Sequence, residues 1–347
     1  LITYAMVILA FVIMQILISA GSISSLLQGL MVPLCTYIIL AVSLNLVVGI
    51  LGELSLGHAG FMCVGAFTSA FFSKCTRDVI ASDGLRFFLA LLIGIVTAAI
   101  FGMLIGIPVL RLKGDYLAIV TLAFGEIIKN MVNVLYIGKD SKGFHVTTKD
   151  VMALNMDADG TVILNGPQGI TGTPKNSTFV IGFILILLTL FIVQNLINSR
   201  DGRAIMAIRD NRIAAESIGI NITKYKLMAF TISAAMAGAA GVLYAHNIST
   251  LTANTNNFGY NMSITILVFV VLGGIGNIRG SIIAAVILTL LPELLRGMKD
   301  YRMLIYAIVL IVMMLFNWSP KAIEWREKLN DWRKKHFSFG KKAKEVE

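Results

Sequence analysis

Charge is the scarcest property of this sequence. Asp, Glu, Lys and Arg make up only 14% of its 347 residues, whereas they make up about 25% of a typical soluble domain. Hydrophobic residues make up 57%, and the mean hydropathy is +0.82. So few charges cannot cover the surface of a soluble globule. The composition therefore excludes an ordinary soluble protein and indicates a membrane protein.

Cysteine and catalytic motifs are scarce as well. Cys35, Cys63 and Cys75 are an odd number without metal-ligand spacing, so they predict neither a disulfide framework nor a metal site. The sequence contains no G-x-x-x-x-G-K-[ST] phosphate loop, no H-E-x-x-H motif and no nucleophile with a paired base. We therefore predict that the chain is not an enzyme and that it holds no metal, cofactor or nucleotide.

Long apolar runs fill most of the chain. Their continuity favours helices over the alternating strands of a β-barrel. We predict an all-α polytopic integral membrane protein with about ten transmembrane helices, some of them discontinuous. The first run lacks a small-residue cleavage site, so we interpret it as a span rather than a signal peptide. The expected spans are 1–20, 29–50, 54–73, 87–110, 115–135, 178–197, 226–247, 261–277, 280–296 and 302–317.

Glycines interrupt two of these runs, at 52–60 and at 273–276. Interrupted spans are typical of discontinuous helices around a substrate path. Small residues also allow close helix packing, and that is our interpretation of the residues spaced by four in 94–106 and 233–245. For His58 we favour packing over path lining. The candidate path residues are Ser55, Gly57, His58, Phe61, Glu126, Gly273 and Gly274.

Glu126 is a carboxylate inside an apolar run. It follows Asp115 by eleven residues, which places it about 16 Å along a helix at 1.5 Å per residue, near the middle of a bilayer. Lys129 and Asn130 fall on the same face, three and four residues later. Charged groups at such depth are costly and usually functional. Two interpretations stay open: a structural ion pair with Lys129, which we favour, and a residue that lines the path.

The positive charges predict an orientation. The net charge is +10, and Lys and Arg gather at 111–113, in 200–226 and after 320. Cytoplasmic loops carry such an excess, so we expect both termini in the cytoplasm and an extracytoplasmic insertion at 136–177, with a turn at 165–170. We expect one transmembrane domain, 1–320, with a cytoplasmic segment at 198–226. A cytoplasmic basic tail, 321–347, follows and contacts lipid. No basic stripe carries interleaved aromatics, so nucleic-acid binding is not expected.

The cytoplasmic segment contains a short predicted helix. Asp210 is a plausible N-cap and Gly219 a plausible end. Between them Ile213, Ala214, Ala215 and Ile218 offer a small apolar face. Such a helix suits a groove in a partner protein, and it equally suits the lipid surface. The residues alone leave both alternatives open.

Seven stretches carry a further signal: SLGHAGF at 55–61, LRLKGDYLAIVTLAFGEII at 110–128, NGPQGITG at 165–172, GRAIMAIRDN at 202–211, AAESIG at 214–219, VLGGIGNIRG at 271–280 and LPELLR at 291–296. Together these stretches, which cover about 40–317, resemble the LivM-type permeases of bacterial branched-chain amino acid ABC importers. The external segment 140–165 looks longer and more acidic than expected for that family.

The resemblance implies a permease subunit in the bacterial plasma membrane that forms half of a translocation path. It implies a second, LivH-like permease, an extracytoplasmic binding protein, and two cytoplasmic ATPase subunits that bind ATP and Mg. The implied substrates are branched-chain amino acids, with urea, short amides or nucleosides as alternatives and a stand-alone secondary transporter as a less favoured one. The residues implied to couple to the ATPase are Arg209, Asp210, Ala214, Ala215, Glu216 and Gly219.

Overall fold

The computed structural model describes residues 2–21, 24–77, 79–112, 114–157, 160–295 and 301–318. The chain divides into two compact units, Leu1–Val286 and Ile287–Glu347. The basic tail predicted at 321–347 lies outside the described residues, as does Lys113.

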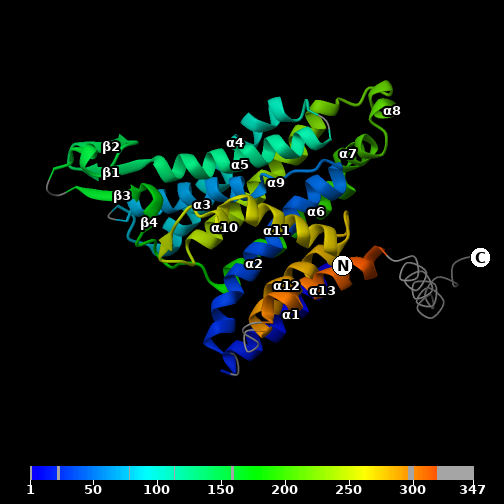
Figure 1. The fold of residues 1–347 in the computed structure, drawn as a ribbon, viewed down its shortest axis with the longest axis horizontal. Coiled ribbons are helices and arrows are strands. Elements are labelled where there is room, and N and C mark those ends of the chain that lie inside the picture. The colour runs from blue at the N-terminus through cyan, green and yellow to red at the C-terminus, as the bar shows by residue number, and fades with distance from the viewer. Residues whose placement is uncertain are drawn as a thin grey trace, which may run out of the picture. The chain divides into compact units, whose positions relative to one another are not determined.

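Helices make up most of the first unit (Figure 1). Helix α12 (Ile278–Leu294) begins in this unit, and α13 (Arg302–Trp318) belongs to the second unit. The remaining helices are α1 (Ile2–Ser19), α2 (Ser25–Asn45), α3 (His58–Cys75), α4 (Asp83–Val109), α5 (Asp115–Val134), α6 (Phe179–Asn198), α7 (Arg200–Asp210), α8 (Arg212–Ser217), α9 (Ile222–Ala245), α10 (Thr255–Phe258) and α11 (Tyr260–Gly273).

A helix occupies every range in which the sequence predicts a span. Among the described residues, six helices are long and apolar enough to cross a membrane. A bilayer offers no hydrogen-bond partners to backbone amides, and a helix satisfies its own. The chain is therefore a mostly helical, polytopic membrane protein, and the count of ten spans stays a prediction.

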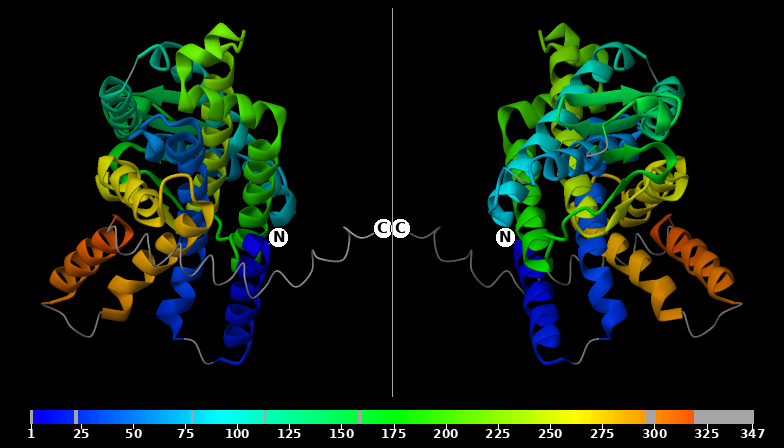
Figure 2. Two further views of the ribbon diagram at one scale, coloured as in Figure 1. Left: turned by 90° about the vertical axis from the view of Figure 1, so that its right-hand side faces the viewer. Right: turned by 90° about the vertical axis from the view of Figure 1, so that its left-hand side faces the viewer.

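Small residues bring three helices of the first unit into close contact. Helices α3, α4 and α9 lie side by side (Figures 1 and 2). A Cβ on Gly65 of α3 would overlap the backbone of Gly238 on α9, and a Cβ on Gly238 would overlap Ala98 of α4. A Cβ on Gly94 of α4 would overlap Val242 of α9. A Cβ on Gly241 of α9 would overlap the backbone of Met62 of α3. The prediction that the small residues spaced by four serve helix packing is thus confirmed.

The expectation of an all-α chain needs one correction, because two small antiparallel sheets lie in and beside the insertion. Strands β1 (Tyr136–Asp140), β2 (Gly143–Thr147) and β3 (Thr161–Asn165) pair in the order β2-β1-β3, with Gly138 opposite His145. Strand β4 (Ile170–Thr171) pairs with β5 (Thr250–Leu251), which follows α9. The predicted turn is confirmed as a 3-10 turn, η3 (Gly166–Gln168).

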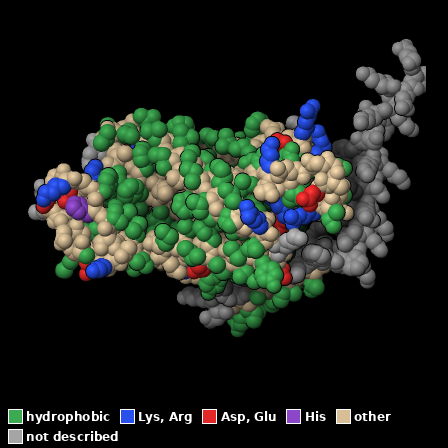
Figure 3. Space-filling model, turned by 90° about the horizontal axis from the view of Figure 1, so that it is seen from above, with side chains coloured by type: hydrophobic (Ala, Val, Ile, Leu, Met, Phe, Trp, Pro, Cys, Tyr) green, Lys and Arg blue, Asp and Glu red, His purple; other side chains and the backbone are tan. Residues whose placement is uncertain are grey.

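The charged segments lie at opposite ends of the first unit. Strands β1 to β3 lie at one end, and α7 and α8 lie at the other (Figure 1). On the face drawn in Figure 3, hydrophobic side chains cover the middle and charged side chains gather toward the two ends. This distribution suits a bilayer that surrounds the middle and leaves both ends in water.

Candidate functional site

The first helix break lies between α2 and α3. Helix α2 continues into a π-helical turn, η1 (Leu46–Leu51), and Gly52 ends it in the left-handed region at φ 78°. Glycine adopts this conformation without a steric penalty, which explains why the helix stops there. Residues 52–57 are not helical, and α3 begins at His58. The sequence therefore located this discontinuity correctly, although α3 begins four residues after the expected start of the span.

Ser55 and His58 are both buried at this break, with 1% and 2% exposure. The Nε2 atom of His58 lies 2.7 Å from the Oγ of Ser43 on α2, so the imidazole has a hydrogen-bond partner inside the bundle. Within the described part of the chain, no group hydrogen-bonds the hydroxyl of Ser55. This geometry favours the packing interpretation for His58.

Gly57 and Phe61 lie where α3 meets α5. A Cβ on Gly57 would overlap the backbone carbonyl of Thr121, and the backbone N–H of Leu56 donates to the Thr121 hydroxyl at 3.0 Å. The ring of Phe61, 1% exposed, lies 5.6 Å from that of Phe124 on α5. These candidate path residues are thus brought together at a tightly packed helix contact in this conformation.

Glu126 on α5 forms an ion pair with Lys129, as the sequence predicted. The carboxylate also accepts a hydrogen bond from the backbone N–H of Tyr260 at 2.8 Å, at the start of α11. Lys129 donates to the hydroxyl of Thr255 on α10 at 3.2 Å. The pair therefore connects α5 to both α10 and α11. No local sequence pattern predicts the partners on α10 and α11, because they are more than 120 residues away.

The second break separates α11 from α12. Gly274 and Gly276 have φ values of 92° and 80°, and α12 begins at Ile278. A Cβ on Gly273 would overlap the backbone of Ser281 on α12, so the two helices approach closely there. Gly274 therefore begins a tight turn between the two helices, and Gly273 packs at the end of α11, so a path-lining role for either residue stays a prediction.

The two breaks contact each other through Asn45, a residue that our sequence analysis did not single out. Its Oδ1 accepts from the backbone N–H of Gly276 at 2.9 Å, and its Nδ2 donates to the Ser281 hydroxyl at 2.9 Å. A Cβ on Gly49 of η1 would overlap the backbone of Gly276. Asn45 is fully buried, and an amide in an otherwise apolar run is a signal that sequence reading can use.

The segment predicted to couple to an ATPase contains two helices, α7 and α8, and the N-cap of α8 differs from the expected one. Helix α7 continues through Asp210, and Asn211 caps α8 by accepting from the backbone N–H of Ala214 at 3.0 Å. The Asp210 carboxylate instead accepts from Arg209, at 3.1 Å from Nε and 3.0 Å from Nη2. Gly219, with φ 85°, ends the segment as predicted.

One side of α8 faces the protein and the other faces outward. Ala215 is 2% exposed and packs with Ile208 and Ile222. Ile213 and Ile218 are 81% and 75% exposed, and Ala214 and Glu216 are exposed beside them. The predicted apolar face is therefore split, because Ala215 holds α8 on the bundle while Ile213, Ala214 and Ile218 point away from it.

Two contacts attach the segment 198–226 to the first break. The Nη1 of Arg209 donates to the carbonyl of Gly49 at 3.0 Å, at the end of η1 where carbonyls lack helical partners. Lys226, near the start of α9, forms an ion pair with Glu53, which follows η1, and both side chains are largely buried. Asn45, Gly49 and Arg209 thus connect the segment to both helix breaks.

The family model described as branched-chain amino acid transport system / permease component matches residues 26–316. This chain belongs to that permease family. Several permeases are similar to it along most of their length. LivM of the high-affinity branched-chain amino acid transport system of Salmonella typhimurium is 35% identical over 322 residues, which are 83% of this chain and 67% of the relative.

Two further permeases extend the comparison. LivM of Escherichia coli K12 is 34% identical over 321 residues, with the same coverage of both chains. LivH, another permease of that transport system, is 25% identical over 258 residues, which are 73% of this chain and 79% of LivH. No solved structure matches the chain. Membership in this permease family agrees with the apolar middle of the molecule and its charged ends (Figure 3).

Proposed function

We propose that this chain is the LivM-like membrane subunit of an ABC importer for branched-chain amino acids. It forms half of the translocation path beside a LivH-like permease. Two cytoplasmic ATPase subunits bind ATP and Mg, and an extracytoplasmic binding protein delivers the substrate. The similarity to LivM and LivH supports this assignment. The path is expected near the two breaks, which carry Ser55, Gly57, Gly273 and Gly274.

The observation that carries the mechanism is the attachment of α7 and α8 to the breaks. Exposed Ile213 and Ile218 with Glu216 form a small docking face for an ATPase, and Ala215 fixes this face to the bundle. When ATP binding moves α8, α7 moves with it. Arg209 then transmits the motion to Gly49 and so to both breaks. The bundle in this way changes between outward-open and inward-open states.

The coupling role predicts a specific loss. Glu216→Ala removes an exposed charge and is expected to weaken ATPase association modestly, because exposed ion pairs contribute about 0–1 kcal/mol. Gly219→Val forces a β-branched residue into a left-handed conformation and is expected to reduce transport strongly. Both variants should leave binding-protein affinity unchanged. Co-purification of the ATPase and leucine uptake driven by ATP measure these effects. Normal, tightly coupled transport in both variants would show that the segment is a lipid anchor instead.

The proposed orientation has its own test. In a chain with Cys35, Cys63 and Cys75 replaced, expressed without the ATPase subunits that would cover Ile213, Met152→Cys and Ile213→Cys offer matched sites, 88% and 81% exposed. Since the two accessibilities are similar, labelling reports only the side of the membrane. An impermeant maleimide is expected to label position 152 in intact cells and position 213 only after permeabilisation. Equal labelling of both from outside would reject the ten-span arrangement with a cytoplasmic coupling segment.

The substrate is tested with the complete importer in proteoliposomes. Leucine, isoleucine and valine are expected to compete with one another for uptake, whereas urea and nucleosides should not compete. The reverse pattern would assign the chain to one of the alternative substrates and leave the permease role intact.

A further inference from the structure

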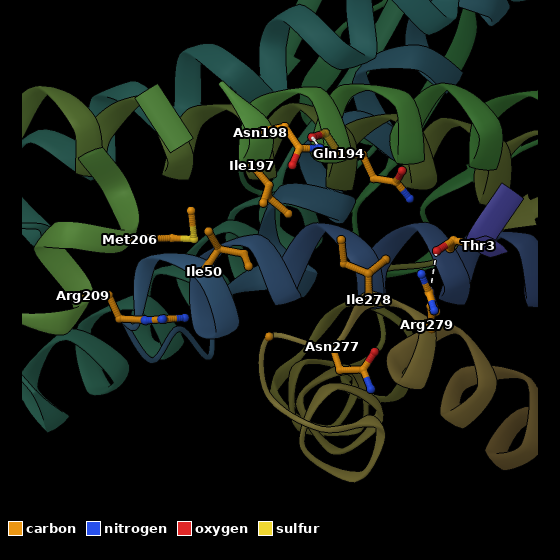
Figure 4. A pocket seen from close by; sticks show the side chains of 11 residues that line it. Thr3, Ile50, Gln194, Ile197, Asn198, Met206, Arg209, Asn277, Ile278 and Arg279 are labelled. Atoms are coloured by element: carbon orange, nitrogen blue, oxygen red, sulfur yellow. Dashed lines mark hydrogen bonds between the residues drawn. The ribbon is translucent and has the colours of Figure 1, made fainter. Parts of the chain in front are cut away.

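A cavity of about 500 Å³ lies beside the coupling segment (Figure 4). Its walls come from α1, η1, α6 and α7 and from residues 276–279 at the start of α12. These elements all belong to the first unit. The cavity is large enough for a small polar group, and its walls come from elements on both sides of the Asn45 and Gly276 contact.

Two arginines give the cavity a positive charge. Arg209 from α7 and Arg279 from α12 lie on different sides of it (Figure 4). Arg279 donates through Nε to the Thr3 hydroxyl at 2.9 Å, and no carboxylate of the described residues pairs with it. Asp210 and the Gly49 carbonyl occupy the Nε, Nη2 and Nη1 atoms of Arg209, and Asp210 is 68% exposed, so solvent screens its charge. A guanidinium binds phosphate through two parallel N–H donors. The Nη atoms of the exposed Arg279 side chain are the donors that favour a phosphate-bearing anion here.

The remaining lining separates into a polar and an apolar part. Gln194 and Asn198 on α6 and Asn277 before α12 bring side-chain amides to the wall (Figure 4). Ile50 and Ile278 add apolar surface. A soluble phosphate needs only the first part, whereas a phospholipid needs both: a polar wall for its headgroup and an apolar wall for the start of its acyl chains.

We propose that this cavity binds the phosphate headgroup of an anionic phospholipid. Basic pockets between membrane helices on the cytoplasmic side are suited to such headgroups. The cytoplasmic location rests on the proposed orientation, but the binding itself does not. A bound phosphate places one negative charge between α7, which carries the coupling segment, and α12, which follows the second break. The lipid thus stabilises the contact between the coupling segment and both breaks.

The test uses the purified full-length chain, delipidated in detergent, and counts bound lipid by native mass spectrometry. Phosphatidylglycerol is expected to bind at one tight site with at least about tenfold higher affinity than phosphatidylcholine, a difference of about 1.4 kcal/mol. Both lipids carry the phosphate, but the arginines repel the choline cation of phosphatidylcholine. Arg279→Gln should remove this preference, and Arg279→Lys should retain part of it. Arg200→Gln is the matched control, because Arg200 is exposed on α7 outside the cavity and the charge change is identical.

A second variant removes the space instead of the charge. Gln194→Trp fills the cavity and keeps both arginines, so it should abolish the tight site in a folded chain.

Equal affinity of the unmodified chain for phosphatidylglycerol and phosphatidylcholine would by itself overturn the proposal. So would unchanged phosphatidylglycerol binding in Arg279→Gln. If glycerol 3-phosphate displaces the lipid at an equal concentration, the site is one for soluble phosphates and the lipid assignment is wrong. The maleimide labelling above is independent of all these outcomes.

Discussion

The ion pair of Glu126 and Lys129 allows a quantitative prediction. The two side chains are 23% and 9% exposed, so water screens them little. Removing one partner of a buried pair costs about 3–5 kcal/mol, because the other charge is left uncompensated. Glu126→Gln leaves the Lys129 ammonium with a neutral amide and the hydroxyl of Thr255. We expect a loss of about 3 kcal/mol, the lower end of that range, since part of Glu126 reaches solvent.

Lys129→Met should cost less, about 1–2 kcal/mol, because the Glu126 carboxylate keeps the backbone N–H of Tyr260 and is the more exposed partner. The double variant, Glu126→Gln with Lys129→Met, should recover most of the loss. Asn130→Met, on the exposed neighbouring position, is the control. The assay is the amount of monodisperse assembled protein and its unfolding midpoint in detergent, since 3 kcal/mol corresponds to roughly a 100-fold change in the folded-to-unfolded ratio.

The outcome distinguishes the two roles of Glu126. A structural pair predicts poor assembly of Glu126→Gln and rescue by the second change. A path-lining carboxylate predicts normal assembly, poor transport and no rescue. Full assembly with unchanged transport would refute both roles and would place Glu126 near solvent.

Three further perturbations follow from the contacts described. Gly49→Ala in η1 should destabilise the protein by about 1–3 kcal/mol, because the added methyl group overpacks the break. Gly29→Ala on α2 is the control and should not destabilise it, because the space around Gly29 is open. Thermal unfolding in detergent compares the two variants. Lys226→Met should lower assembled protein by stranding the Glu53 carboxylate, and Glu53→Gln in addition should restore it. Burial raises the pKa of Asp140, but backbone N–H donors and a nearby histidine outweigh it and hold that pKa below its ordinary value. The stability this gives is present above the ordinary pKa of about 4 and is lost as pH falls below it. The protection of backbone amides in β1 to β3 against hydrogen exchange, corrected for the intrinsic pH dependence of exchange, should therefore fall there, and Asp140→Asn should abolish this dependence.

Local features of the sequence predicted a large part of the fold. Apolar runs of span length fixed the positions of the long helices, and glycines marked both breaks because their backbones need positive φ. Gly219 ended the coupling segment for the same reason. The pairing of Glu126 with Lys129 followed from helical spacing alone. All of these features depend on residues close in sequence.

The features that the sequence did not predict depend on contacts between residues far apart in the chain, or on a choice between adjacent residues with similar capping properties. Asn45 meets Gly276 across 231 positions, and no local pattern encodes such a contact. Asp210 and Asn211 are both good caps, and the choice follows from α7 continuing through Asp210. The strands of the insertion have five residues at most and include charged positions such as Lys139, so their alternation is too short to detect.

The close glycine contacts among α3, α4 and α9 have a consequence for how such permeases diverge. A side chain on Gly65 would collide with the backbone of Gly238 on α9, whereas a side chain on Gly238 would collide with Ala98 on α4. A single substitution at either position would therefore need to displace a neighbouring helix, whereas an exposed position on α4 such as Ile100 has no such constraint. Among related sequences, we expect Gly65 to remain unchanged and Gly238 to change only together with a loss of volume at position 98.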